Sequence, residues 1–525
     1  MTAIITNQFR LQNLQYSKRD IDDGVDKYYL AIGRSNDWTD DNNPPTPNID
    51  YEDEISARLD MQSMKEITDI VYCVPRYNWT NGNTYVAYDD NDATQGSNQF
   101  YVINSSNFNV YICLRAGSGT STVEPTGVDD GGSGTPADKG SVDPSAGGDG
   151  YVWKYLYTIS ASDADKYLTT DFMPVFRDTN VAANATLGQI WDYNIVSGGT
   201  GYSSAPTLAV EGDGSGATAT ATLTGGVVTS ISVTGVGSGY TYARVVVSGG
   251  SPTTAAQIDP VIGPVSLGRE IASIDVTGGG TSYTNGSLTL NIEGDGFDAT
   301  ATATVTGGVI QASPTIDTAG YSYTNATVTP AETTAGTTAT LVAEFSAAKG
   351  GFGYDPVVDL GAYYLMFNVV LTGAEGSGDF VPGNNYRQLM IIKNPLDRSS
   401  PQKAFTSSTG TAMPYLDVQA GGTWPNDALM TGGTSGAQAY IVYYDSANEF
   451  VYYVQNDDTG YDAFTDGESI TGSGIASASI AVAAGSASNP SEIDNLSGRL
   501  LYLENRSPVS RASDQTEDIK LVVQF

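Results

Sequence analysis

The stretch Gly148–Ile159, GDGYVWKYLYTI, is the part of the sequence that best indicates the fold. Its residues alternate with the period of two that is typical of a β-strand, and they follow a long run of Gly, Ser, Pro, Thr and Asp. The alternation predicts two faces: one with Tyr151, Trp153, Tyr155, Tyr157 and Ile159, the other with Val152, Lys154, Leu156 and Thr158. We expect a core strand with partners on both edges and a layer over its aromatic face. A ligand platform is the alternative.

Segments of similar apolar density lie far from this strand. Val357–Leu396 contains YYLMFNVVL and YRQLMIIKNPL, which are apolar on both faces, as central strands are. The last residues of the chain alternate again between apolar and polar side chains. The sequence therefore predicts that strands near 151–159, 386–393 and 519–525 share one core, interrupted by other material.

The composition, with 60 Gly and 33 Tyr, favours a β-dominated protein with many tight turns. We predict a mainly β fold with a few short helices (α+β): a discontinuous β-sandwich-like core with two inserted β modules. Helices are expected at Asn7–Ser17, Tyr51–Lys65 and Ser160–Leu168. The predicted parts are core segments in 1–183 with a flexible loop at 117–147, tandem repeat modules in 184–352, a core return in 353–402, a second inserted β module in 403–490, and C-terminal core strands in 491–525.

An internal repeat defines the first insertion. Leu208–Thr222 (LAVEGDGSGATATAT) returns 82 positions later as Leu290–Thr304 (LNIEGDGFDATATAT). A smaller spacing of 38 positions joins Tyr202 to Tyr240, and Tyr283 to Tyr321. This pattern predicts two small β modules in tandem, built from short strands and Gly turns. In 403–490, a β-hairpin is expected around Asp445–Glu449.

Charge and composition exclude several classes of function. Asp and Glu number 59 against 24 Lys and Arg, so the formal net charge is -35, which repels nucleic acid and anionic membranes. The chain has no His, which removes the usual general base and most metal-ligand sets. We expect no enzyme activity, no cofactor and no metal. The only cysteines, Cys73 and Cys113, are expected to be free thiols.

Two kinds of motif could bind ions. The Gly-Asp-Gly sequences in the repeats and the run Asp89-Asp90-Asn91-Asp92 resemble calcium loops, but their spacing favours turns. Arg499, Arg506 and Arg511 form a basic cluster near the C-terminus. In so acidic a chain they are expected to pair with acids in the core or across an interface, and anion binding is the alternative.

Several stretches, in order, resemble one known family, the baseplate wedge subunit of T-even-type contractile-tailed bacteriophages (the dimeric wedge component). They are IITNQFR at Ile4–Arg10, Gly33-Arg34-Ser35 with Trp38, Val74-Pro75-Arg76 with Trp79, GDGYVWKYLYTI, Pro382-Gly383-Asn384, RQLMIIKNPL at Arg387–Leu396, and the ending YLENRSPVSRASDQTEDIKLVVQF. Together with their flanks they cover a minority of the chain. Both inserted regions depart from the family pattern.

The resemblance implies a structural protein of the virion tail baseplate, present in the host cytoplasm during assembly. It implies a homodimer that links neighbouring wedge subunits during assembly and contraction, with contacts to other wedge proteins and to tail pin or fibre proteins. The family-motif residues expected at interfaces are Arg34, Trp38, Arg76, Trp79, Tyr151, Trp153, Arg387, Asn394, Arg499, Glu504, Arg506 and Arg511. The first alternative is a tail-fibre or tailspike-like adhesin whose Gly/Tyr repeats bind host surface glycans. A carboxylate-based glycan hydrolase is the second.

Overall fold

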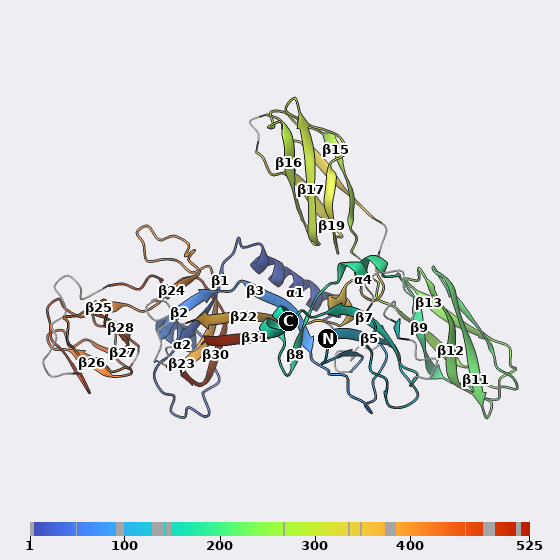
Figure 1. Cartoon of the computed structure of the whole chain (residues 1–525), viewed down its shortest axis with the longest axis horizontal. Coiled ribbons are helices and arrows are strands. Elements are labelled where there is room, and N and C mark those ends of the chain that lie inside the picture. Colours follow the sequence, from blue (N-terminus) through green and yellow to red (C-terminus); the bar gives the residue numbers. More distant parts are fainter. Residues whose placement is uncertain are drawn as a thin grey trace. The chain divides into compact units, whose positions relative to one another are not determined.

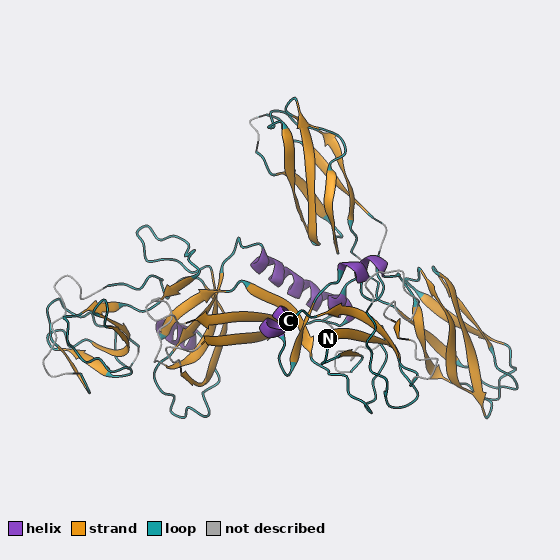
Figure 2. Cartoon of the chain, in the orientation of Figure 1, coloured by secondary structure: helices purple, strands orange, loops and turns teal. Residues whose placement is uncertain are grey.

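The computed structural model of the chain describes residues 5–48, 50–90, 99–128, 141–142, 149–265, 268–333, 336–346, 349–372, 385–456, 458–475, 489–510 and 516–525. β-Strands make up most of its regular structure (Figure 2), so the predicted mainly β fold is confirmed. Figure 1 labels the elements. The chain forms two compact units: unit 1 comprises 1–13, 72–364 and residue 525, and unit 2 comprises 14–71 and 365–524.

The strand predicted at the centre of the fold lies in unit 1. This strand, β7 (Val152–Thr158), has β5 (Asn109–Arg115) on one edge and β6 (Ser141–Val142) on the other, and β4 (Tyr101–Ile103) lies beyond β5. The predicted pairing on both edges is therefore confirmed. The remaining elements around this sheet are β8 (Phe172–Val175), which pairs with β3 (Asp69–Pro75), and the helices α3 (Ala161–Tyr167), α4 (Thr179–Asn184) and α5 (Pro356–Asp359).

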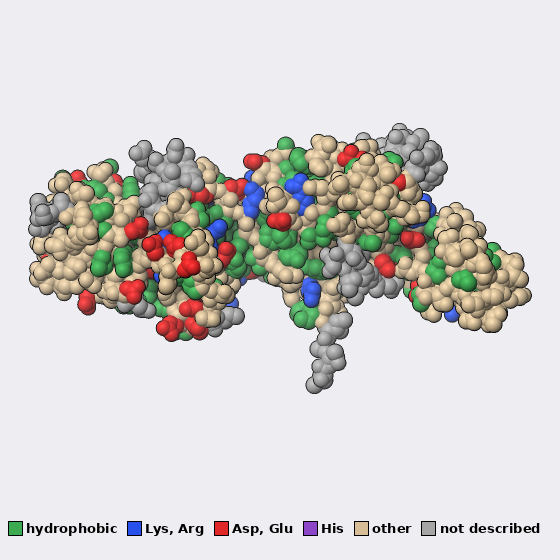
Figure 3. All heavy atoms as spheres, turned by 90° about the horizontal axis from the view of Figure 1, so that it is seen from below, with side chains coloured by type: hydrophobic (Ala, Val, Ile, Leu, Met, Phe, Trp, Pro, Cys, Tyr) green, Lys and Arg blue, Asp and Glu red, His purple; other side chains and the backbone are tan. Residues whose placement is uncertain are grey.

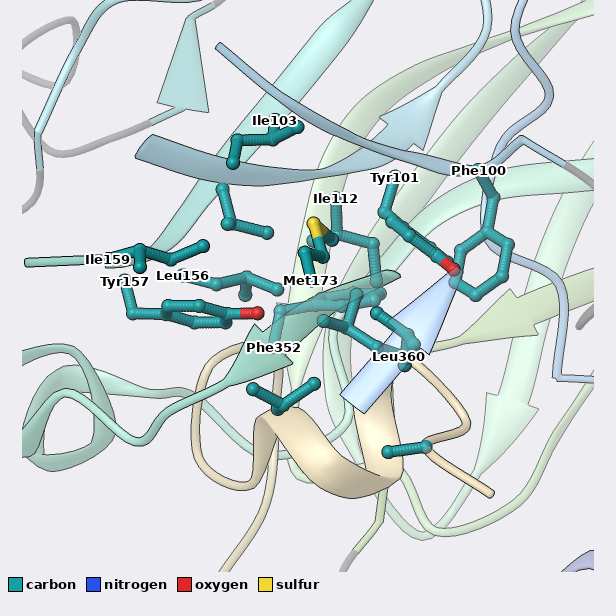
Figure 4. Close-up of a cluster of buried hydrophobic side chains, with 14 of the residues drawn as sticks. Phe100, Tyr101, Ile103, Ile112, Leu156, Tyr157, Ile159, Met173, Phe352 and Leu360 are labelled. Carbon is teal, nitrogen blue, oxygen red and sulfur yellow. The ribbon is translucent and has the colours of Figure 1, made fainter. Parts of the chain in front are cut away.

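The predicted alternation of β7 is wrong beyond Tyr155. Tyr155 pairs with Tyr111 and Tyr157 with Val110, so Leu156 is an extra residue at a β-bulge. The bulge inverts the alternation, and Leu156 and Tyr157 both enter the hydrophobic cluster shown in Figure 4. Tyr151, Trp153 and Tyr155 enter a separate aromatic cluster. One strand thus contributes to two cores.

The described residues of the region 117–147 make contacts near β7. Asp149 accepts hydrogen bonds from the Ser121 hydroxyl (2.9 Å) and from the backbone N–H groups of Thr122 (2.5 Å) and Val123 (3.0 Å). Ser141–Val142 forms β6 against β7. The sequence does not predict these two contacts, which lie within the region 117–147 and beside it. Residues 129–140 and 143–148 lie outside the described part of the chain.

The 82-residue repeat corresponds to two similar sets of strands. Module A comprises β9 (Ile190–Ser197), β10 (Thr207–Gly212), β11 (Ser215–Thr224), β12 (Val227–Ser238), β13 (Ala243–Ser248) and β14 (Gln257–Ile262). Module B comprises β15 (Ile271–Gly278), β16 (Gly286–Gly294), β17 (Phe297–Thr306), β18 (Val309–Ile310), β19 (Thr315–Tyr321), β20 (Ala326–Pro330) and β21 (Thr340–Phe345). Each module has its own hydrophobic cluster, in which the alanines of the ATATAT runs face inward. Phe352, by contrast, packs in the cluster around β7.

Unit 2 contains a five-stranded antiparallel sheet in the order β24-β2-β1-β23-β30. Its strands are β24 (Thr409–Thr411), β2 (Met61–Glu66), β1 (Tyr28–Gly33), β23 (Asn385–Lys393) and β30 (Arg499–Ser510). The strands β22 (Tyr364–Thr372) and β31 (Thr516–Gln524) are neighbours in another sheet. The prediction of one shared core is wrong, because β7 belongs to unit 1 whereas β23 and β31 lie in unit 2. Apolar density indicates burial but does not identify the partner.

Two helix predictions need correction. The helix α2 (Tyr51–Leu59) ends six residues before the predicted Lys65, and β2 starts at Met61. Pairing with β1 (Met64 opposite Ala31) buries Met64 completely, so tertiary contacts override the helical pattern. The helix α1 (Asn7–Asp22) continues five residues beyond the predicted Ser17.

The second inserted region, 403–490, forms a five-stranded sheet in the order β25-β28-β27-β26-β29. The bounds are β25 (Tyr415–Asp417), β26 (Leu429–Gly432), β27 (Gln438–Asp445), β28 (Phe450–Val454) and β29 (Ile470–Gly472). The predicted hairpin is confirmed, because β27 and β28 are antiparallel neighbours joined at Asp445–Glu449. Leu416, Met430, Ile441 and Val451 are among the buried residues of its cluster.

Candidate functional site

Arg387 is the centre of a charged cluster in unit 2. Its side chain is only 2% exposed, and it lies on β23, where Gln388 pairs with Gly33 of β1. The guanidinium donates to both carboxylate oxygens of Asp41, through Nε (3.0 Å) and Nη2 (2.9 Å). It also donates to the Asp37 carboxylate and to the Ser35 carbonyl. A single buried arginine thus holds the loop that follows β1.

Arg34 and Trp38 complete this cluster. Arg34 has a positive φ of 54°, and its guanidinium lies 3.9 Å from the centre of the Trp38 ring and 3.3 Å from the Asp60 carboxylate. The Trp38 indole N–H donates to the carbonyl of Arg506 on β30 (3.0 Å). We call Arg34, Trp38, Asp41, Arg387 and Arg506 the arginine cluster. It joins three segments that are far apart in the sequence.

Two of the cations in the arginine cluster, Arg34 and Arg387, are matched by acids within the chain. The hydrogen bond from Arg387 holds the pKa of Asp41 below its usual value of 3.8. Burial raises the pKa of Asp60, although the neighbouring Arg34 opposes this effect. Burial also raises the pKa of Asp427, again against the field of Arg387. Arg34 and Arg387 serve internal pairing, and the geometry around them is that of a structural clamp.

Arg499 and Arg506 do not form the ion pairs within the core that the sequence predicts, and pairing across an interface stays a prediction. Arg499 is exposed at the start of β30, and neither Arg499 nor Arg506 forms an ion pair with a described acidic residue. The Nε atom of Arg506 is buried without a hydrogen-bond partner. Glu504 accepts a hydrogen bond from the Tyr502 hydroxyl (2.8 Å) instead. Arg511 lies outside the described residues.

Asn394 has a structural role at the end of β23. It adopts a positive φ of 51°, its side-chain oxygen accepts from the Lys27 N–H (2.7 Å), and its side-chain nitrogen donates to Asp26 (2.6 Å). The adjacent Lys393 forms ion pairs with Asp20 (2.5 Å) and Asp26 (2.6 Å). These contacts fix the turn that leads out of the sheet.

The candidate residues of unit 1 are held by backbone groups and neighbouring side chains. Arg76 donates to the Thr169 carbonyl (2.7 Å) and to Asn78 (2.9 Å), and the Trp79 indole donates to the Ser121 hydroxyl (3.1 Å). The Tyr151 hydroxyl donates to the Gly119 carbonyl (2.7 Å), and its ring stacks on Trp153 at 6.0 Å. Tyr151 and Trp153 are buried, so they form part of a core and not a ligand platform.

The Gly-Asp-Gly motifs form turns, as the sequence favours. Asp213 accepts from the Thr241 N–H (2.8 Å), the Thr241 hydroxyl (2.5 Å) and the Tyr242 N–H (3.2 Å). Asp295 occupies the equivalent place in module B and accepts from the Thr324 N–H (2.8 Å), the Thr324 hydroxyl and the Asn325 N–H (2.9 Å). Each carboxylate binds a neighbouring turn of its own module.

These turn contacts predict acid-sensitive modules. Hydrogen bonds from Thr241 hold the pKa of Asp213 below 3.8; burial raises the pKa of Asp295, but hydrogen bonds from Thr324 and Asn325 lower it overall. A depressed folded-state pKa stabilises the fold above the unfolded-state pKa, and this stability is lost as the pH falls through the folded value. We expect the double variant D213N/D295N to have a lower melting temperature than wild type at pH 7. Its melting temperature should fall less than that of wild type when the pH is lowered to 3. Melting followed by circular dichroism measures both.

The control for this experiment is D275N, which changes an exposed carboxylate of module B that accepts no hydrogen bond from a described residue. It should leave the acid sensitivity of the protein unchanged. An equal acid response of D213N/D295N and wild type would contradict the assigned role of these turns.

The tyrosines of the repeats mostly lie in the module cores. Tyr202, Tyr240 and Tyr283 are buried, and the hydroxyl of Tyr202 accepts from the Ala256 N–H (2.7 Å), as that of Tyr283 does from the Ala339 N–H (2.9 Å). In module A the ring of Tyr240 packs over the Gly-Asp-Gly turn. In module B the ring of Tyr323 occupies the equivalent place. The 38-residue spacing therefore identifies the wrong tyrosine, Tyr321, because the equivalent tyrosines of module B, Tyr283 and Tyr323, are 40 positions apart and not 38.

The described residues contain no group of three or more Cys, Asp or Glu side chains positioned to hold a metal ion. Within the same part of the chain, no helix is both long and apolar enough to cross a membrane. A scan against protein-family models gives no match for the chain, and a search of curated proteins gives none either.

Arg34, Trp38 and Arg387 are among the residues that the sequence singles out, whereas their partners Asp37, Asp41 and Asp60 are not. The contact between Asp41 and Arg387 spans 346 residues, and 59 acids offer too many candidate partners. Asp149-Gly150 directly before β7 is a turn signal in the sequence, but the sequence does not indicate that the carboxylate binds the distant N–H groups of Thr122 and Val123.

Proposed function

We propose that this chain is a non-enzymatic structural component of a contractile phage tail baseplate, a homodimer that links neighbouring wedge subunits during assembly and contraction. The observation that carries the proposal is the arginine cluster. Three stretches on which the family resemblance rests, around Arg34 and Trp38, Arg387, and Arg506, lie together there. Stretches that resemble one family and also assemble into one sheet are better support than scattered motifs.

The physical character of the site favours a mechanical role over a chemical one. Arg387 is buried, hydrogen-bonded on all sides by groups of its own chain, and located on a central strand of the sheet. Such a clamp resists displacement of the loop when force is applied to the sheet. Acid–base chemistry instead needs a titratable group that can reach a substrate.

The surface charge fits a partner that is neither nucleic acid nor membrane. Acidic side chains are spread over the face shown in Figure 3, and the chain carries a formal charge of -35. Free copies would repel each other at long range and dock to basic or neutral protein surfaces. Other wedge proteins and tail pin or fibre proteins are the proposed partners, in the virion and, during assembly, in the host cytoplasm.

The adhesin alternative has less support. Three of the four tyrosines on which it relied are core residues of modules A and B, and each of these three accepts a backbone hydrogen bond through its hydroxyl group. They are not available as stacking platforms for sugar rings.

Sedimentation of the full chain across a range of salt concentrations tests the proposal. We expect a dimer with the mass of two 55.0 kDa chains. The dimer should persist or become more stable as the salt concentration rises to molar, because salt screens the repulsion between acidic side chains and leaves apolar contacts intact. Docking to basic partner proteins should weaken over the same range. A monomer at every salt concentration, a trimer, or binding to duplex DNA at physiological salt would contradict the proposal.

A further inference from the structure

The strand β30 forms an open edge of the five-stranded sheet of unit 2. It pairs with β23 on one side, and the strand order ends there. Within the described part of the chain, residues 499–504 form no backbone-to-backbone hydrogen bond outside the ladder with β23. An edge strand presents N–H and C=O groups to which another strand can add. We call residues 499–504 the β30 edge.

Contacts within unit 2 cover both ends of the β30 edge and leave its middle open. Arg58 donates to the Gly498 carbonyl (3.1 Å) just before the edge, and the Trp38 indole donates to the Arg506 carbonyl (3.0 Å) shortly after it. Between these contacts, Leu501 is 53% exposed. All of these residues belong to unit 2. The open edge is therefore short and bounded at both ends.

A β-bulge at Leu501 interrupts the alternation of side chains along the β30 edge. Leu500 pairs with Ile392 and Tyr502 pairs with Ile391, so Leu501 is an extra residue. Because Ile391 and Ile392 are neighbours on β23, they point to opposite faces of the sheet. Leu500 and Tyr502 therefore lie on opposite faces as well, although they are two positions apart.

The bulge determines which side chains of the β30 edge share a face. Arg499, Tyr502 and Glu504 lie on one face, where the Tyr502 hydroxyl donates to the Glu504 carboxylate (2.8 Å). Leu500 and Leu503 lie on the other face, where both pack against a buried hydrophobic cluster of unit 2. One face of the edge is thus charged at both ends, and the other is apolar.

Arg499 has no acidic partner among the described residues of its own chain. It is exposed, and the residue directly opposite it on β23 is Lys393, a second cation. Like charges directly opposite one another destabilise a pair of strands. A carboxylate placed on the open side of Arg499 would compensate for this arrangement.

The β30 edge is complementary to a second, antiparallel copy of itself. If Tyr502 lies on a twofold axis and the bulge residue Leu501 stays outside the ladder, Leu500 lies opposite Leu503 of the partner subunit. In the same register, Arg499 lies opposite Glu504 of the partner subunit. A twofold axis perpendicular to a sheet keeps each side chain on its own face, and the members of both pairs do share a face. One register thus matches the charged and the apolar positions together.

We propose that the β30 edges of two copies pair antiparallel across a twofold axis and join their five-stranded sheets into one continuous sheet. β30 is labelled in Figure 1. This inference rests on the proposed function, because it supplies the contact for the proposed dimer. The ion pair of Arg499 then joins two copies, so removing it affects association and not the folding of unit 2 within one chain.

Charge reversal tests the β30 edge by sedimentation equilibrium of the full chain. Arg499→Glu and Glu504→Arg each replace both ion pairs of the dimer with pairs of like charge, so we expect each to raise the dissociation constant at least about tenfold. Arg499→Glu makes the chain more acidic, whereas Glu504→Arg makes it less acidic. A general effect of net charge would therefore change the two dissociation constants in opposite directions.

Combining the two substitutions is the matched control. In the double variant Arg499→Glu/Glu504→Arg, opposite charges again face each other, so the dissociation constant should return to near the wild-type value. An equimolar mixture of the two single variants should likewise form mixed dimers. Circular dichroism should show that all three variants are folded.

The outcomes separate this inference from the proposed function. A wild-type monomer contradicts the proposed dimer itself. A wild-type dimer that both single variants leave intact, or that the double variant fails to restore, overturns the β30 pairing and leaves the proposed function standing.

Disulfide formation tests the register. Opposite residues of an antiparallel pair have Cα atoms roughly 4.5–5.5 Å apart, which is within reach of a disulfide. Tyr502→Cys should therefore crosslink two copies, because this position lies opposite itself, and Leu501→Cys should crosslink more slowly. The native Cys73 and Cys113 are buried and should contribute little background. Faster crosslinking of Leu501→Cys, or no crosslinking of Tyr502→Cys, would overturn the register.

Discussion

Replacing Trp153 with alanine should lower the free energy of unfolding of unit 1 by about 4 kcal/mol, the typical cost of removing a large aromatic side chain from a core. Trp153 is 1% exposed, packs edge-on against Tyr85 at 5.3 Å and stacks on Tyr151. Hydrogen exchange of peptides that cover β5 and β7 is the measurement. Protection there should fall about a thousandfold where exchange requires unfolding of the unit, while peptides from unit 2 stay unchanged.

The control for this prediction is Trp153→Phe. The indole nitrogen of Trp153 is buried without a hydrogen-bond partner, so losing it removes no hydrogen bond and only part of the ring volume. We expect Trp153→Phe to lower the free energy of unfolding of unit 1 clearly less than Trp153→Ala does. If both variants exchange like wild type, Trp153 does not hold the aromatic cluster together.

Replacing Arg387 with methionine should destabilise unit 2 by about 3 kcal/mol, because hydrogen bonds to charged groups are each worth about 1.5–3 kcal/mol and several are lost together. The expected loss of unfolding free energy is no larger because Asp37 is 82% exposed and Asp41 is 30% exposed, so water can solvate both carboxylates in the variant. Peptides covering β1 and β23 should exchange about a hundredfold faster. The loop after β1 should lose protection first.

Arg499→Met is the matched control, since Arg499 is exposed and forms no ion pair with a described residue. We expect Arg499→Met to change the free energy of unfolding of unit 2 by no more than about 0.5 kcal/mol, as for most surface substitutions. Equal effects of Arg387→Met and Arg499→Met would show that the arginine cluster is not a clamp.

The sequence predicted individual elements well where a local pattern dictates them. The strand at Val152–Thr158, the hairpin at Asp445–Glu449 and the 82-residue repeat are all present, and β11 and β17 coincide exactly under that shift. Periodicity and turn residues act over a few positions, so one segment contains the whole signal.

The predictions failed where a distant partner decides the structure. The bulge at Leu156 depends on the register with β5, and the end of α2 depends on the pairing of Met64 with Ala31. The arginine cluster likewise depends on contacts across hundreds of residues. A single sequence does not indicate which of many acids meets Arg387, so only the three-dimensional structure shows the clamp.

The pairing of first and last strands in the repeats has an evolutionary consequence. In module A, β9 pairs with β14, so Ile190 at the entrance lies opposite Ile262 near the exit; in module B, Ile271 likewise lies opposite Phe345. The chain enters and leaves each module at the same end. Recombination between the two similar coding stretches would therefore add or remove a whole copy while its neighbours stay joined. Lineages of this protein are expected to differ in copy number by entire modules.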